Sequence, residues 1–124
     1  MKLIEALNAI DAMEYSDYTQ AEKIRWLSEL DMTVKREILD THEGSEAYRD
    51  FTGYTVQTDV NTELLVPHPY DRMYLHWLEA RVSYANREID PYNNAMTTFN
   101  SVYADFFNWY NRNHMAYGKS VKWM

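Results

Sequence analysis

PYDRMYLHWLEARVSYANREIDPYNNAMTTFNSVYADFFNWYNR is the sequence of residues 69–112. This stretch has the clearest helical pattern of the chain. Its apolar side chains recur at spacings of three and four, which predicts two helices, over 69–88 and 91–112. Asp90 followed by Pro91 is typical of an N-cap and a first-turn proline, so the second helix begins there. Because about two residues join the helices, we expect an antiparallel hairpin that forms most of the core.

The predicted helix 69–88 carries two apolar stripes. One stripe is aliphatic, and the other is mainly aromatic: Leu75, Leu78, Val82, Ala85 and Ile89 against Tyr70, Met73, Tyr74, Trp77 and Tyr84. An amphipathic surface helix needs a single stripe. This helix is therefore either central in its own bundle or in contact with another chain, and we predict that Tyr70, Tyr74 and Trp77 contact a neighbouring subunit.

The first third of the chain predicts two further helices, over 2–13 and 19–42. The first is amphipathic and is either a core-facing strut or a docking helix. Thr19 and Glu22 have the spacing of a capping box, which predicts the start of the second. An unbroken helix over 19–42 would be about 36 Å long. Because that is long for so small a domain, a break near Asp31 is an alternative.

Residues 45–66 lose the helical period and predict a long loop, or an irregular β-hairpin with strands near 51–56 and 63–66. A loop of this length inside a small domain is uncommon and is often functional. Its apolar residues need a surface to cover them: Phe51, Tyr54, Leu64, Leu65 and Val66. We predict that Phe51, Tyr54, Leu64 and Leu65 contact a neighbouring subunit, and the alternative is that the loop folds over its own bundle.

Together these elements predict an all-α fold: a small four-helix bundle with a long central loop or irregular β-hairpin and an extended C-terminal tail. The 124 residues suffice for one domain, and 46% hydrophobic residues indicate a folded chain. We place the helical domain at 1–112 and a C-terminal arm at 113–124. Basic and aromatic side chains of the arm and its base are predicted to bind a partner: Arg112, Tyr117, Lys119, Lys122 and Trp123.

The net formal charge of −7 is concentrated in the first half of the chain. Residues 1–66 hold 14 acidic and 6 basic side chains, whereas residues 67–124 hold 5 and 6. The carboxylates on the polar side of the predicted helix 19–42 form an acidic face: Glu22, Glu29, Glu37 and Asp40. Because binding to phosphate backbones depends on Lys and Arg, an acidic chain is not expected to bind nucleic acid specifically.

The chain contains no cysteine, which excludes disulfides, thiolate metal sites and a thiol nucleophile. No apolar run approaches the roughly 18 residues that cross a bilayer, and Glu5 interrupts the apolar start. We therefore expect a cytosolic, soluble protein that does not bind membranes.

Sequence motifs that carry chemistry are not found. The histidines lack HExxH spacing, the glycines are too few for a phosphate loop, and no serine lies in GxSxG. We expect no catalytic residue, no cofactor, no metal and no enzymatic activity. Thirteen of the 19 Phe, Trp and Tyr residues lie between Tyr70 and Trp123. This surplus favours protein binding, because Tyr and Trp are common at interfaces, although an aromatic core is the alternative.

Three stretches resemble a family of small phage structural proteins: WLSELDMTVKREILDTHEG (26–44), FTGYT (51–55) and residues 62–114. The most specific part is YDRMYLHWLEARVSYANRE followed by YNNAMTTFNSVYADFFNWYNR. The family comprises the head-completion or head-tail connector adaptors of siphophages that infect low-GC Gram-positive bacteria.

This resemblance implies a virion structural protein of the phage neck, assembled in the host cytoplasm. Its subunits would form a dodecameric ring under the portal protein, extend the DNA channel and dock tail or stopper proteins. The family's portal engagement would map onto residues 113–124, and an acidic lumen would let DNA pass without binding. The rival hypothesis is an acidic DNA mimic, or a small phage-encoded inhibitor of a DNA-binding protein.

Overall fold

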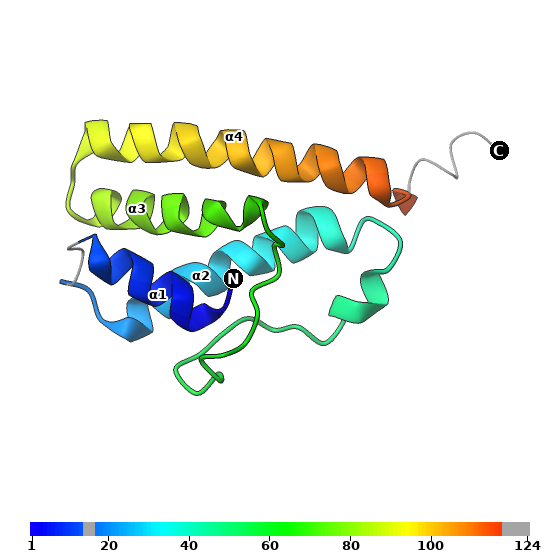
Figure 1. Ribbon diagram of the computed structural model, residues 1–124, viewed down its shortest axis with the longest axis horizontal. Helices are drawn as coiled ribbons and strands as arrows, with labels where there is room; N and C mark the ends of the chain where they lie inside the picture. Colours follow the sequence, from blue (N-terminus) through cyan, green and yellow to red (C-terminus); the bar gives the residue numbers. More distant parts are fainter. Residues whose placement is uncertain (14–16, 118–124) are drawn as a thin grey trace.

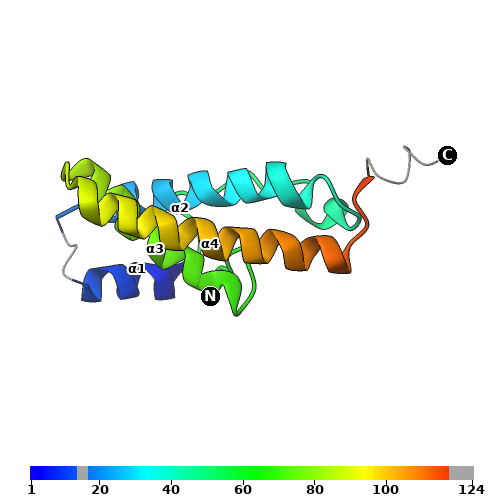
Figure 2. The same cartoon turned by 90° about the horizontal axis from the view of Figure 1, so that it is seen from above.

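Helix α3 (Met73–Ala85) is the centre of the fold in the computed structural model of the chain. It contacts α1 (Leu3–Ala12), α2 (Gln20–Val34) and α4 (Ile89–Asn113). Figure 1 shows α1 and α2 on one side of α3 and α4 on the other, and Figure 2 shows α4 lying over the rest of the bundle. Helix α4 is therefore an outer layer that is covered on one side only.

The structure describes residues 1–13 and 17–117. Within these ranges it is a small bundle of four helices without a strand, so the predicted all-α fold is confirmed. Helices α1, α3 and α4 begin and end within four residues of their predicted bounds, whereas α2 ends at Val34, eight residues before the predicted end at 42. The N-cap of α4 is Glu88, so the predicted N-cap Asp90 lies inside the first turn. A short 3₁₀ turn, Tyr70–Arg72, precedes α3, so the predicted helix 69–88 is split at its start.

The two apolar stripes of α3 are explained by its central position. Met73, Tyr74 and Leu78 are all 0% exposed, although they belong to different stripes. Helix α3 contacts α1, α2 and α4 of the same chain, which together cover it on more than one side. Of the two alternatives, the central position is thus the one that the structure contains.

Helix α1 is a core-facing strut, because Leu3, Leu7 and Ile10 are buried. Its first amides are bonded by the distant loop: Leu3 N–H donates to the carbonyl of Thr62 at 2.9 Å. Ile4 N–H donates in the same way to Val60 at 2.9 Å. The loop thereby satisfies two of the backbone donors that a helix start leaves unpaired.

Helix α2 does not break at Asp31. The Thr19 hydroxyl accepts from the amide of Glu22 at 3.2 Å, as the capping-box spacing predicts. At its other end the helix passes directly into a π turn, Lys35–Leu39, where Asp40 N–H donates to the carbonyl five residues earlier. This wide turn changes the helical register of the residues that follow it.

Between the 3₁₀ helix Ser45–Tyr48 and Tyr70 the chain forms no strand, so the predicted strands 51–56 and 63–66 are absent. The loop alternative is the one observed. Figure 1 shows this segment running below α1 and α2 and then rising past the N-terminus to α3. Tyr54, Leu64 and Val66 are buried against the chain's own helices, whereas Val56 and Val60 are 65% and 43% exposed.

The residues after α4 turn back onto the end of the π turn. Glu43 N–H donates to the carbonyl of Met115 at 2.9 Å, and Tyr117 N–H donates to that of Thr41 at 3.0 Å. The described part of the predicted arm is therefore held against its own domain by an antiparallel bridge between His42 and Ala116.

Candidate protein-binding surfaces

Asp31 is the centre of a buried polar cluster that attaches the loop to the bundle. Its carboxylate accepts hydrogen bonds from the hydroxyl of Tyr54, from that of Tyr74 at 2.7 Å and from the amide of Leu65 at 3.1 Å. The Tyr74 hydroxyl also accepts from the amide of Val66 at 2.8 Å. Asp31, Tyr54 and Tyr74 are called the loop clamp below.

Burial sets the acid-base properties of the loop clamp. Desolvation raises the pKa of Asp31 above its ordinary value, while the hydrogen bonds to its carboxylate act in the opposite direction. Burial raises the pKa of both the Tyr54 and the Tyr74 hydroxyls, and the nearby Asp31 carboxylate adds to that effect. The cluster is closed to solvent and its polar groups are engaged, so it acts as a structural tether.

A close backbone approach lets Tyr54 reach Asp31. Gly53 has φ +97°, and a Cβ there would lie 2.2 Å from the Oγ of Ser28. The same Oγ accepts from the amide of Tyr54 at 2.9 Å. The motif FTGYT thus needs its glycine in order to lie against α2.

The predicted inter-subunit residues lie mostly inside the chain. Tyr54, Leu64 and Tyr74 belong to the core, so the prediction that they contact a neighbour is wrong for these three. The others are half-buried and pack against the core: Phe51, Leu65, Tyr70 and Trp77. The physical reason is that the loop folds over its own bundle, where the loop clamp holds it.

The four acids of the predicted acidic face reach solvent, but they do not form a uniform stripe. Glu37 and Asp40 lie in and after the π turn, so the α-helical spacing that aligned them with Glu22 and Glu29 does not hold across it. Asp40 pairs with Lys35 at 2.9 Å. Arg25, Lys35 and Arg36 stand among the four acids in the sequence, so this surface is of mixed charge.

The aromatic surplus is mostly internal. Tyr70, Phe106 and Trp109 contact one another in a row of rings between α3 and α4, and Tyr110 continues the row to a stacked His114. Burial and the Glu37 carboxylate, which accepts from its hydroxyl, raise the pKa of Tyr103. The aromatic-core alternative therefore accounts for most of these rings, and few remain exposed.

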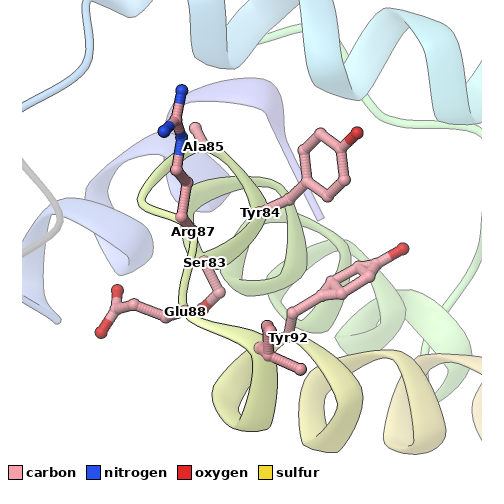
Figure 3. Close-up of a pocket in the computed structure, with 7 residues that line it drawn as sticks. Ser83, Tyr84, Ala85, Arg87, Glu88 and Tyr92 are labelled. Carbon is pink, nitrogen blue, oxygen red and sulfur yellow. The ribbon is translucent and has the colours of Figure 1, made fainter.

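An open pocket of about 600 Å³ lies where α3 turns into α4 (Figure 3). We call it the hairpin-end pocket; it is lined by Ser83, Tyr84, Ala85, Arg87, Glu88, Ile89 and Tyr92. Tyr84 is 66% and Ile89 73% exposed, which is unusual for large apolar side chains. In Figure 3 both tyrosine rings extend to one side, whereas Arg87 and Glu88 point away from them.

The wall of this pocket contains an arginine stacked on aromatic rings and a turn residue with a positive φ. The guanidinium of Arg81 lies over Trp77 at 4.4 Å and also near the rings of Tyr84 and Tyr92, at 5.5 and 5.6 Å. Arg87 has φ +61° and occupies the position after the C-cap of α3, where glycine is usual. Because a non-glycine residue in this conformation costs about 1 kcal/mol, the turn stores a small strain.

The outward side of α4 is almost free of charge. We call it the α4 outer face; its exposed residues are Asn93, Asn94, Thr97, Thr98, Asn100, Ser101, Ala104, Asp105, Phe107 and Asn108. Asp105 is the one charged side chain between Pro91 and Asn111. The hydroxyls of Thr97 and Thr98 donate to carbonyls of their own helix at 2.9 and 3.2 Å. These hydroxyl donors therefore keep a partner when water is removed from the face.

The four histidines do not come together. His42 is buried, with Nδ1 2.7 Å from the carbonyl of Ile38 and Nε2 beside the amide oxygen of Asn111. His68 and His76 each lie near an acid of their own segment. Within residues 1–13 and 17–117, no three His, Asp or Glu side chains are grouped so that they could hold a metal ion.

The predicted arm residues are only partly described. Arg112 is exposed on the last turn of α4, and the Tyr117 hydroxyl lies 3.2 Å from the Oγ of Ser45. Lys119, Lys122 and Trp123 lie outside the described residues. None of the helices in the described ranges is both long and apolar enough to cross a membrane.

Sequence reasoning missed the loop clamp and both surfaces on the α3–α4 hairpin. Asp31 had a visible signal, because it lies four residues after Leu27 and three before Val34 and is therefore an acid on the apolar side of its helix. The α4 outer face could also have been found from the absence of Lys, Arg and Glu in residues 91–111. Comparison with protein-family models, with curated proteins and with solved structures finds no match to this chain.

Proposed function

We propose that this chain is a non-catalytic structural subunit that works by binding other protein surfaces. More specifically, we propose a head-tail connector subunit of a tailed phage, which forms a ring under the portal, extends the DNA channel and docks tail or stopper proteins. The sequence resemblance to the siphophage adaptors supports the specific form. The general form rests on the α4 outer face.

The α4 outer face is suited to protein contact because removing water from it costs little free energy. Removing water from a charged side chain costs far more than removing it from a hydroxyl that keeps a hydrogen bond, and the asparagine amides of this face can bond to polar groups of a partner. Interface cores are accordingly depleted in charged residues. Helix α4 has 25 residues, so this surface extends along a helix of about 37 Å.

In the ring, the mixed-charge surface of α2 would face the channel and the α4 outer face would contact the portal or a tail protein. Residues 20–40 hold five acids and four bases, so this surface would give each subunit a net charge of only −1 toward the lumen. A DNA mimic would instead need unpaired carboxylates at phosphate-like spacing. Asp40 is paired with Lys35, and Glu29 lies 3.9 Å from Arg25, which does not favour that rival.

Two matched substitutions test the role of the α4 outer face. Ala104→Arg places a charge in the middle of this face, whereas Ala21→Arg places the same charge on the exposed side of α2. Both replace an exposed helical alanine, so each should change folding stability by no more than about 0.5 kcal/mol, with Ala21→Arg the less favourable of the two because it lies in the first turn of its helix. Each protein is mixed with the purified portal ring encoded by the same genome, and attachment is measured by mass photometry and negative-stain electron microscopy.

We expect the unmodified chain and Ala21→Arg to form a ring on the portal. Ala104→Arg should bind at least about tenfold more weakly, because an added charge would have to be buried without a partner. If both variants attached equally well, the α4 outer face would not be the contact. If none of the three proteins attached, the connector function itself would be wrong.

A further inference from the structure

We propose that the hairpin-end pocket binds residues 118–124 of a second copy of this chain, with Trp123 as the side chain that enters it. This goes beyond the proposed function, because it concerns the free protein and names the occupant of one site. It also gives the C-terminal arm a different partner from the portal protein that the family resemblance implies.

The pocket offers what a large aromatic side chain needs. It is lined mainly by Tyr84, Ile89 and Tyr92, which are exposed or half-buried in the isolated chain. The Arg81 stack fixes the tyrosine walls before anything binds, so little side-chain entropy is lost on docking. A tryptophan held between preformed aromatic walls is a typical anchor of a protein interface.

The segment 118–124 cannot reach the pocket of its own chain. The pocket lies at the start of α4, whereas Tyr117 is tied to Thr41 near the far end of the same helix. Figures 1 and 2 both show these two places at opposite ends of the molecule. They are separated by about 37 Å along α4, and seven residues span at most about 25 Å. The contact must therefore be between two copies.

Charge complementarity supports the same occupant. Residues 118–124 contain Lys119, Lys122 and no acid, whereas the rest of the chain has a net charge of −9, since the whole chain is at −7. At the pocket itself Glu88 and the neighbouring Asp90 are balanced by Arg87 and Arg81, so the attraction comes from the net negative charge of the body as a whole. A basic segment is thus attracted to the body of another copy.

Such a contact joins one end of a molecule to the opposite end of the next. A head-to-tail interface of this kind leaves a free pocket and a free segment on every pair, so it continues until a ring closes. The geometry therefore provides a lateral contact for a ring without using the α4 outer face. That face stays available for a different partner.

The test uses full-length chains in sedimentation velocity, at concentrations up to about 1 mM, where weak contacts are populated. Trp123→Ala removes the anchor and keeps the pocket. Ala85→Arg fills the pocket with a cation and keeps the anchor, and Arg is tolerated there because Ala85 is in the last turn of α3. Ala21→Arg is the matched control, and circular dichroism checks that each variant is folded.

We expect the unmodified chain and Ala21→Arg to associate, and each of the two site variants to bind itself at least about tenfold more weakly. An equimolar mixture of Trp123→Ala and Ala85→Arg should form one-to-one pairs, because one supplies the pocket and the other the anchor. An unmodified chain that stays monomeric, a site variant that associates normally, or a mixture without pairs would overturn the inference.

The outcome is independent of the proposed function. If pairs form in the mixture but no protein attaches to the portal ring, the pocket inference stands and the connector function falls. If Trp123→Ala self-associates normally and fails only to attach to portal, the arm binds portal and the inference is wrong.

Discussion

Helices α2 and α4 are packed on opposite sides of α3, yet their outward sides differ in charge. The exposed side of α2 and its π turn carries Arg25, Glu29, Arg36 and Glu37, whereas that of α4 carries only Asp90 in its first turn and Asp105 up to Asn111. Folding needs only the inner side of each helix to be apolar. The uncharged outer side of α4 is thus not a requirement of the fold, and binding explains it better.

The α2 side and the α4 side of the molecule also differ in where buried polar groups lie. On the α2 side, Asp31 is buried and accepts hydrogen bonds from the loop. The inner side of α4 is lined mainly by aromatic and aliphatic residues, with Phe99, Val102 and Phe106 at its core. The α2 side therefore holds the fold together through specific polar contacts, and the α4 side is free to serve binding.

Asp31→Ala should cause the largest loss of folding stability, because it removes the centre of the loop clamp on the α2 side. It leaves two buried tyrosine hydroxyls and the amide of Leu65 without their acceptor. We expect the free energy of unfolding to fall by about 3–5 kcal/mol, measured by urea denaturation. Tyr54→Phe removes one hydrogen bond and should cost about 1–2 kcal/mol. A loss below that of Tyr54→Phe would show that the loop clamp is not a tether.

Gly53→Ala tests the approach of the loop to α2. The added Cβ would lie 2.2 Å from Ser28 Oγ, and the residue has a positive φ, so we expect a loss of about 2–4 kcal/mol in thermal or urea unfolding. Gly44→Ala is the control, because its φ is +85° but the space around it is open. It should cost about 1 kcal/mol. Equal losses would mean that the contact with Ser28 is unimportant.

The pH dependence of stability gives a third test of the α2 side. Burial raises the pKa of Asp31 in the folded chain above its ordinary value of 3.8, so the folded chain holds a proton that the unfolded chain releases. The contribution of Asp31 to stability is then complete below pH 3.8 and is lost as the pH rises to the folded-state pKa. The slope is at most about 1.4 kcal/mol per pH unit.

This slope can be isolated by subtraction. The unfolding free energies of the unmodified chain and of Asp31→Asn are measured by urea denaturation across the same acidic range. The difference between them should decrease with rising pH, because the other carboxylates are common to both proteins. A difference that does not vary with pH, or that increases, would contradict a raised pKa.

Arg87→Gly should stabilise the α4 side by about 0.5–1 kcal/mol. Glycine adopts the positive φ of this position without the steric cost that arginine bears, and the Schellman hydrogen bonds from residues 87 and 88 are kept. The melting temperature should rise by a few degrees. A decrease would indicate that the Arg87 side chain makes a stabilising contact in solution.

Ala104→Arg should have the smallest effect on stability, and this sharpens the contrast between the two sides. Because the α4 outer face takes no part in the core, we expect a change within about 0.5 kcal/mol, no larger than that of Ala21→Arg. A substitution that changes binding and leaves stability unchanged identifies a functional surface. A large loss of stability would mean that the face is part of the folded core.

The regular elements could be predicted from the sequence because their signals are local. The apolar spacing in residues 69–112 fixed the α3–α4 hairpin, and the Thr19–Glu22 spacing fixed the start of α2. The charge asymmetry, the absence of cysteine and the absence of known catalytic spacings also follow from composition and order alone. In each case neighbouring residues carry the whole signal, as helix periodicity and capping require.

The loop clamp, the folding of the loop over its own bundle and the hairpin-end pocket depend on contacts between residues that are distant in the sequence. These features are therefore visible only in the tertiary structure. Asp31 meets Tyr54 and Tyr74 across 23 and 43 residues of sequence, so no local pattern announces the contact. Whether an apolar loop residue faces its own bundle or a neighbour depends on which surfaces the packing of distant helices leaves uncovered. Residue spacing along the chain specifies the helices and their apolar sides, whereas the packing of distant segments specifies which apolar and uncharged surfaces are left for a partner.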